Sequence, residues 1–362
     1  MMNNIPYLLA LHSIDGLGPI RLRAVLEYFK DPKLAWEAKA EELLKIGIYK
    51  NTINLLIETR KKLEPETYAK KIAERGIKWV TIFDDNYPRL LAQIYDPPLV
   101  LYYKGELNSL NNKTVAVVGT RKITGYGKIA TIQFTKGLVA SGLTIVSGLA
   151  RGVDSQAHLT AVSEGGKTIA VLGGGLNNIF PPENRGLAAK IANGFGAVVS
   201  EFPPDYPSLP GNFPARNRII SGLSLGVVVI EAAEDSGSLI TARLALEQGR
   251  EVFAVPGPIT SDLSKGPVDL IKDGARAVFG PDEILEELGI SQNQKSNIKN
   301  QNGENLTDEE KIILKTLENE NRHIDEIGRE LNFPSQKISA LLLKMEISGL
   351  VQSIGAGVYC KK

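Results

Sequence analysis

The feature that most constrains the fold of this sequence is a regular alternation of short apolar runs with helical stretches between residues 111 and 290. Most of the runs are continuously apolar, which is typical of parallel strands buried on both faces. Helical stretches such as Tyr126–Ala140 and Leu239–Gln248 supply the crossover connections. The alternation predicts an α/β fold with a doubly wound sheet, whose ligand lies beyond the carboxyl ends of the strands. The predicted strands are Val115–Gly119, Thr144–Gly148, Thr168–Gly173, Ala197–Glu201, Gly226–Ala232, Glu251–Gly257 and Ala277–Gly280.

Segments of different composition flank this region. The first 105 residues have amphipathic patterns and are predicted to be mostly helical. We place a helical domain at residues 1–75 and the α/β domain at residues 80–290. Residues 291–305 are rich in Asn and Gln and cannot bury enough apolar surface to offset their ordering entropy, so they predict a flexible linker. Residues 306–362 predict a third domain, with helices followed by a hairpin.

Charge and cysteine content exclude several classes of protein. The 42 Lys and Arg residues nearly balance the 41 Asp and Glu residues, which excludes a surface that is cationic throughout but not a local basic cleft. Cys360 is the one cysteine, so an intrachain disulfide and a cysteine-rich zinc site are excluded. No apolar run approaches the roughly 18 residues of a membrane span, and the N-terminus lacks the basic start of a signal peptide. We therefore expect a cytoplasmic protein without membrane contact.

The loops after the predicted strands are rich in glycine, other small residues and arginine. Small residues let backbone N–H groups approach an anion, and arginine adds a fixed charge with forked donors. Each loop by itself is equally consistent with an ordinary turn of an α/β protein. Several such loops at one sheet edge favour an anionic ligand. The loops are Gly119–Lys122, Ser147–Asp154, Gly173–Gly175 and Ser236–Thr241.

The densest cationic segment is Phe213–Arg218 (FPARNR). Two arginines that flank an asparagine beside an aromatic ring suit a phosphate backbone with stackable bases. The alternative is a proline-rich connection whose arginines are merely solvated.

Nucleotide-binding and catalytic motifs match poorly. Gly119, Gly125 and Gly127 do not have the G-x-G-x-x-G spacing of a dinucleotide site, and Gly166-Lys167-Thr168 leads into a predicted strand instead of the helix that a P-loop needs. The sequence shows no metal-ligand cluster and no nucleophile–base order. Glu201 and Glu231 end predicted strands, where they are candidates for acids or for partners of neighbouring donors.

Four collinear blocks of this sequence resemble the DprA/Smf family, DNA-processing protein A. The resemblance covers about residues 80–290 and implies an extended Rossmann-like fold that binds single-stranded DNA without a cofactor or metal, dimerises and passes the DNA to the RecA recombinase. The blocks are VVGTR (117–121), SGLARGVDSQAH (147–158), FPARNRIISGLS (213–224) and EAAEDSGSLITARLALEQGREVFAVPG (231–257).

Carried over by position, the resemblance implies a nucleic-acid site made of strand-end loops and the FPARNR segment. One departure is the sequence Gly266-Pro267-Val268, where the family usually has a polar pair, which puts the contribution of that loop in doubt. The residues implied are Gly119, Thr120, Arg121, Lys122, Ser147, Gly148, Arg151, Gly152, Gly173, Gly174, Phe213, Arg216, Asn217, Arg218, Ser236, Gly237, Ser238 and Thr241.

Both flanking segments agree with this resemblance. Ile14–Pro19 (IDGLGP) resembles a helix-hairpin-helix turn of the SAM-like N-terminal domain that the family often carries, although an ordinary turn between helices fits the same residues. At the other end, helices near Glu309–Glu318, Asp325–Leu331 and Ser335–Ser348 precede two short strands about Gly355–Gly357, as in a winged helix. Its recognition helix has only two lysines, Lys337 and Lys344, so protein contact or weak DNA contact is favoured over tight duplex binding.

The resemblance therefore implies a non-catalytic mediator of recombination that protects incoming single-stranded DNA and loads RecA in natural transformation, as a homodimer. The rival is a nucleotide phosphoribohydrolase with a related fold. Such enzymes typically have a glutamate after Pro-Gly-Gly-x-Gly-Thr, whereas the comparable segment here is Ser236–Thr241, with no glutamate before Glu247. A sensor of a nucleotide signal is a third alternative and would need a closed pocket.

Overall fold

The computed structural model describes residues 4–107, 113–290, 307–317, 320–347, 350–355 and 357–361. The chain divides into two compact units, residues 1–291 and 292–362. The predicted linker, 291–305, and the ends of two predicted helices, Glu318 and Ser348, lie outside the described residues. So does Ala356, in the middle of the predicted turn.

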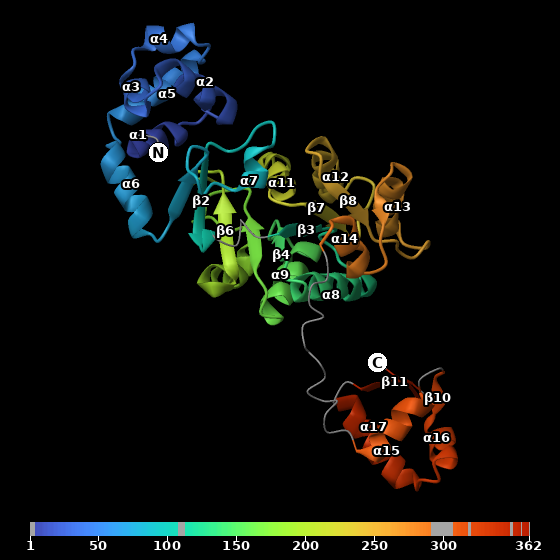
Figure 1. Cartoon of the computed structure of the whole chain (residues 1–362). Coiled ribbons are helices and arrows are strands. Elements are labelled where there is room, and N and C mark those ends of the chain that lie inside the picture. The colour runs from blue at the N-terminus through green and yellow to red at the C-terminus, as the bar shows by residue number, and fades with distance from the viewer. Residues whose placement is uncertain are drawn as a thin grey trace. The chain divides into compact units, whose positions relative to one another are not determined.

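A nine-stranded sheet crosses the first unit, in the order β1-β2-β6-β5-β4-β3-β7-β8-β9 (Figure 1). Strands β3 to β9 pair in parallel, which confirms the doubly wound fold. Strands β3 to β8 fall on six of the predicted strands, whereas β9 shares only Ala277 with the seventh. Their bounds are β3 Thr114–Val118, β4 Thr144–Ser147, β5 Thr168–Val171, β6 Gly196–Ser200, β7 Gly226–Val229, β8 Glu251–Ala254 and β9 Arg276–Ala277.

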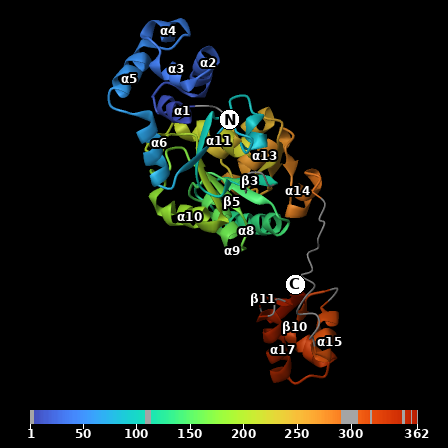
Figure 2. The same ribbon diagram turned by 60° about the vertical axis from the view of Figure 1, so that its left-hand side comes forward.

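Helices cover both faces of this sheet, because alternate residues of each central strand point to opposite cores. In β3, Val115 and Val117 pack with α8 and α9, whereas Ala116 and Val118 pack with α11 and α12. Figure 1 shows these two helix pairs on opposite sides of the strands, and Figure 2 shows α11 on the side away from α8 and α9. The bounds are α8 Gly125–Ala140, α9 Val153–Ser163, α10 Arg185–Lys190, α11 Asn212–Gly222, α12 Gly237–Glu247, α13 Lys265–Lys272 and α14 Pro281–Glu287.

Two strands inside the first 105 residues depart from the predicted, mostly helical character of that segment. β1 (Lys78–Thr81) pairs antiparallel with β2 (Val100–Gly105), and β2 pairs antiparallel with β6. Both strands are rich in aromatic and β-branched residues, which favour strands, but they are too short for their periodicity to identify them. They extend the sheet beyond the parallel part.

The N-terminal segment is helical, as predicted, and the IDGLGP turn lies between α1 and α2. The apolar core of these helices continues into the sheet through Leu99, Val100 and Tyr102, so it crosses the boundary expected at residues 75–80. The bounds are α1 Ile5–His12, α2 Pro19–Phe29, α3 Pro32–Glu37, α4 Ala40–Lys45, α5 Lys50–Arg60, α6 Pro65–Glu74 and α7 Arg89–Ala92.

The second unit has the winged-helix arrangement. Helices α15 (Asp308–Thr316), α16 (Ile324–Glu330) and α17 (Ser335–Ile347) enclose a core that includes Ile313, Ile327 and Leu342. A sheet in the order β10-β12-β11 joins Arg322–His323 (β10) to the hairpin Val351–Gly355 (β11) and Val358–Lys361 (β12). The sequence predicted the hairpin but not β10. In the part of the chain that is described, no helix is long and apolar enough to cross a membrane.

Candidate nucleic-acid interface

A cavity of about 880 Å³ opens where the order of the parallel strands changes direction. The chain passes outward from β3 through β4, β5 and β6, and returns on the other side of β3 as β7. Loops that follow such strands diverge at this point and leave a crevice for a ligand. The loops after β3, β4, β5, β6, β7 and β8 all contribute to the walls of this cavity, which we call the central pocket.

Most of the predicted site residues line the central pocket. Those that do are Gly119, Thr120, Arg121, Lys122, Phe213, Arg216, Asn217, Ser236, Gly237, Ser238 and Thr241. Ala150 and Asp154, from the predicted loop Ser147–Asp154, also line it. The structure adds lining residues outside the predicted loops, among them Phe180, Pro210 and Asp235.

The loops after β3, β4 and β7 are tied together by their backbones. Thr120 N donates to Glu231 O at 2.6 Å, and Val153 N donates to Thr120 O at 3.1 Å. Gly152 stands at this crossing with φ of +78°, and a Cβ atom there would lie 2.2 Å from Thr120 O. A larger residue at position 152 would therefore push the two loops apart.

Arg121 and two phenylalanines form the outer wall. The Arg121 guanidinium lies 5.7 Å from the centre of the Phe213 ring, in the range of a cation–π contact. Phe180 and Phe213 have ring centres 5.8 Å apart. Arg121 and Lys122 are exposed. This wall combines exposed positive charge with apolar ring faces.

Arg216 forms the floor of the central pocket. Its side chain comes from α11 and the residue is 4% exposed. Nη1 donates to Gly148 O at 2.6 Å and also to Val171 O, and Nε donates to Asn217 Oδ1 at 3.2 Å. Burial lowers the pKa of Arg216 to about 10, so it stays charged at neutral pH. Within the described part of the chain, Nη2 donates no hydrogen bond.

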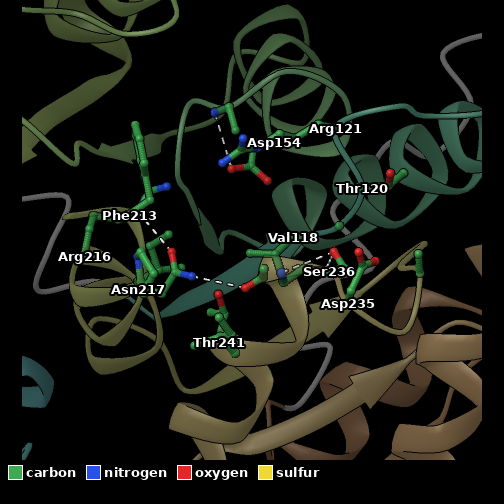
Figure 3. A pocket seen from close by; sticks show the side chains of 18 of the residues that line it. Val118, Thr120, Arg121, Asp154, Phe213, Arg216, Asn217, Asp235, Ser236 and Thr241 are labelled. Carbon is green, nitrogen blue, oxygen red and sulfur yellow. Dashed lines mark hydrogen bonds between the residues drawn. The ribbon is translucent and has the colours of Figure 1, made fainter. Parts of the chain in front are cut away.

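Asn217 and Asp154 hold the surrounding loops. Asn217 Nδ2 donates to Gly237 O at 3.2 Å, which links α11 to the start of α12 (Figure 3). Asp154 Oδ2 accepts from Gly148 N at 3.1 Å and from Ala150 N at 3.4 Å. Burial raises the pKa of Asp154. These hydrogen bonds fix the backbone of the start of α12 and of the loop after β4, which are two of the walls of the central pocket.

Arg218 lies outside the lining of the central pocket, although the sequence placed it in the same site as Arg216. Its Nε donates to Asp96 Oδ2 at 2.8 Å and its Nη2 to Glu201 Oε2 at 2.5 Å, and the residue is 6% exposed. In a helix, residues two apart point about 200° away from each other. Arg218 is therefore part of a buried ion-pair cluster that supports the fold.

Six other predicted residues also lie outside the lining. Ser147 is buried and donates to Val117 O at 2.7 Å, and Arg151 is exposed and paired with Glu183. The glycines lie directly behind the walls. A Cβ atom at Gly148 would lie 2.4 Å from the Arg216 guanidinium, and one at Gly173 would lie 2.8 Å from the Phe213 ring. Gly174 packs on Ser208, and Gly152 has been described above.

The two strand-end carboxylates are engaged with structural partners. Glu231 Oε1 accepts from Thr124 Oγ1 at 2.6 Å and Oε2 accepts from Thr124 N at 3.0 Å, which fixes the start of α8. Glu201 pairs with Arg218. Among the described residues, no group of three or more His, Cys, Asp or Glu side chains is placed to hold a metal ion.

His158 predicts an acid sensitivity of the first unit. It is buried on α9 with Nδ1 2.7 Å from Thr168 Oγ1, and burial lowers its pKa to about 3. In the unfolded chain His158 takes up a proton near pH 6.5, whereas in the folded protein it stays neutral until about pH 3. Protonation therefore favours the unfolded state, and the free energy of unfolding falls as the pH drops from 6.5 toward 3. The free energy of unfolding should fall by roughly 2 kcal/mol from this group between pH 7.5 and 5.

Urea unfolding measured by tryptophan fluorescence tests this prediction, because Trp36 and Trp79 both lie in the first unit. A His158→Asn variant should lose that part of the pH dependence, whereas His323→Asn, in the second unit, should retain it. An unchanged pH dependence in His158→Asn would contradict the assignment.

Known proteins match both units of the chain. The family model of DNA recombination-mediator protein A matches residues 78–289, and that of the DprA winged helix domain matches residues 298–357. The chain belongs to the DprA family. This confirms the resemblance found in the sequence. Protein Smf of Escherichia coli is 44% identical over 277 residues, which cover 75% of this chain and 74% of that protein.

Other DprA proteins agree with this assignment. Protein Smf of Synechocystis is 36% identical and covers 95% of this chain and 96% of its own length. The structure of DprA from Streptococcus pneumoniae has a TM-score of 0.69 at 38% identity and covers 79% of this chain and 99% of that chain. The structure of Helicobacter pylori DprA, described for its single-stranded DNA binding mode, has a TM-score of 0.53 at 33% identity. It covers 58% of this chain and 95% of that chain.

Proposed function

We propose that this chain binds single-stranded DNA in the central pocket, and that the juxtaposition of Arg121, Phe213 and Arg216 carries this function. Arg121 offers an exposed charge and Arg216 a buried charge at the floor, while Phe213 offers an apolar ring face beside Arg121. Cations bind the phosphates of a single strand, and ring faces stack on its bases. Helicobacter pylori DprA, whose structure is described for its single-stranded DNA binding mode, is similar to 58% of this chain.

We further propose the biological role on the basis of family membership. The chain acts in the cytoplasm as a homodimer that protects incoming single-stranded DNA and loads the RecA recombinase in natural transformation. A recombinase must receive a bare strand, so the mediator needs a site that holds the strand and then releases it. A groove that binds through exposed charge and stacking suits such a transfer, because its affinity is moderate and independent of sequence.

We propose that the protein performs no catalysis on this DNA. Hydrolysis of a phosphoester or an N-glycosidic bond needs an activated water or nucleophile. Glu231 lies between β7 and the pocket loop Ser236–Ser238, and both of its carboxylate oxygens accept hydrogen bonds from Thr124. Such a carboxylate positions the β3–α8 loop and is poorly placed to activate water.

Incubation with labelled oligonucleotides and with nucleoside monophosphates separates this function from its rivals. We expect retention of the oligonucleotide, no cleavage with or without Mg²⁺, and no release of base. Turnover that disappears in a Glu231→Gln variant would support the phosphoribohydrolase. Tight binding of a mononucleotide without binding of oligonucleotides would support a nucleotide sensor.

Removal of the second unit should leave DNA binding in place. The three apolar cores of the first unit are made of residues between Leu8 and Ile290, so a protein ending after Ile290 retains all of them. The central pocket also lies entirely within the first unit. We expect the shortened protein to fold and to bind single-stranded DNA within about threefold of the full chain, since its phosphate contacts are unchanged. Loss of binding by the folded, shortened protein would show that the winged helix contributes to the site.

A further inference from the structure

A second cavity, of about 580 Å³, lies between α2 and the segment that follows β1. We call it the lateral pocket. Its walls combine aliphatic side chains and one phenylalanine with two cations and a single carboxylate. The lining residues are Arg23, Leu26, Glu27, Lys30, Ile82, Phe83 and Leu99.

The topology of the sheet places the lateral pocket at the same edge as the central pocket. Because β1 is antiparallel to β2 and β2 is antiparallel to β6, β1 runs in the same direction as the parallel strands. Its carboxyl end therefore delivers Ile82 and Phe83 to the edge where the loops after β3 and β7 form the central pocket. Five strand spacings separate β1 from β3, or about 24 Å. A stacked strand with one phosphate every ~3.4 Å would cover that span with roughly seven phosphates.

Helix α11 leads from the central pocket to α7, which packs against its other end. The N-terminal half of α11 carries Phe213 and Arg216 in the central pocket, and Gly222 at its other end packs against Leu91 and Ile94 of the α7 segment. Tyr95 follows directly and is 95% exposed. An aromatic ring so exposed on the surface is available to stack on a base.

One side chain that lines the lateral pocket has an unsatisfied donor. Arg23 Nη2 is buried and has no hydrogen-bond partner in the described part of the chain. A guanidinium nitrogen without a partner is unfavourable, and the half-buried Arg23 side chain would satisfy it by turning toward an anion in the pocket. Phe83, which is 44% exposed, offers a ring face in the same cavity. Like the central pocket, the lateral pocket has one more cation than carboxylates among its lining residues.

We propose that the lateral pocket is a second anchor for the same DNA strand, reached by way of Tyr95. Arg23 and Lys30 take a phosphate and Phe83 stacks on a base. This inference rests on the proposed function of the central pocket. It assigns to the strand a track along the carboxyl edge of the sheet, from Phe213 across α11 and α7 to α2.

The test compares fluorescence anisotropy of a short oligothymidylate of about five nucleotides with that of one of about 20, which is long enough to reach both pockets. Arg23→Ala and Tyr95→Ala should each weaken binding of the long oligonucleotide by about fivefold or more, the loss expected for one stacked base or one phosphate contact. Both variants should bind the short oligonucleotide like the unaltered protein. Lys78→Ala is the matched control, because Lys78 is an exposed cation at the opposite end of β1 and should affect neither length.

Tyr95→Ala keeps the test decisive if Arg23→Ala folds poorly, because a side chain so exposed contributes little to stability. Long-oligonucleotide binding at the level of the unaltered protein in both variants would overturn the second anchor. An equal loss for both lengths would also overturn it, since the change would then act at the central pocket. If the unaltered protein retained neither length, the proposed function itself would be wrong.

Discussion

Replacing Arg218 with Met should lower the free energy of unfolding of the first unit by about 3–5 kcal/mol. The substitution leaves Glu201 buried beside Asp96 without the guanidinium that bonds to both of them. An unpaired buried charge is strongly destabilising, whereas loss of an exposed ion pair usually costs less than about 1 kcal/mol. Urea unfolding monitored by the fluorescence of Trp36 and Trp79 measures the change.

The pH dependence of this variant identifies the cause. Burial already raises the pKa of Glu201, and loss of Arg218 removes a contact that lowers it. When a carboxyl group has a higher pKa in the folded protein than in the unfolded chain, the folded state loses stability as the pH rises through the folded pKa. The deficit of Arg218→Met should therefore shrink toward low pH, where Glu201 is protonated, and should also shrink in the double variant Arg218→Met/Glu201→Gln. Arg75→Met, which breaks the exposed pair with Asp205, is the matched control and should cost little. A deficit independent of pH would contradict this cause.

Replacing Arg216 with Ala should weaken single-strand binding and also destabilise the fold, whereas Arg121→Ala should affect binding alone. Arg216 is buried and donates to the carbonyl groups of Gly148 and Val171, which would be left without that donor. We expect a stability loss of about 2–4 kcal/mol for Arg216→Ala and no more than about 0.5 kcal/mol for the exposed Arg121.

Affinity titrations at several salt concentrations complete this comparison. Each variant should bind single-stranded DNA about tenfold or more weakly, since a hydrogen bond to a charged group contributes about 1.5–3 kcal/mol. The slope of log affinity against log salt should flatten by roughly 0.7–1 for Arg121→Ala. An Arg121→Ala variant with unchanged affinity and slope would remove this residue from the interface.

The sequence predicts the parallel sheet and its ligand edge well, because short local patterns identify the strands and the loops that follow them. Continuous apolar runs such as Val115–Val118 and Val227–Val229 identify buried parallel strands, and glycine-rich loops after them mark the ligand edge. The loops Gly119–Lys122 and Ser236–Ser238 therefore meet in the central pocket as expected. An extended FPARNR segment would place Arg216 and Arg218 on the same side, but the segment lies in the first turns of α11. With the helical period applied, the two side chains separate onto different faces of α11.

Other features depend on tertiary context that no local pattern contains. Phe180 reaches the pocket from the loop after β5, and only its packing on Phe213 identifies it. The antiparallel strands β1 and β2 are too short for the sequence pattern to identify them, although they bring Phe83 to the edge of the sheet where the ligand binds. Glu201 could have been an acid or a structural partner, and its ion pair with Arg218 decides for the second.

The central claim is that the carboxyl edge of the sheet binds a single strand of DNA through phosphate charge and base stacking. A gel-shift comparison of single-stranded and duplex oligonucleotides of equal length, across a salt series, tests it most directly. We expect the single strand to be retained more tightly than the duplex, because stacking on Phe213 needs exposed bases, and its affinity to fall linearly with log salt. Equal affinity for the duplex, or an affinity for the single strand that does not change with salt, would contradict the account.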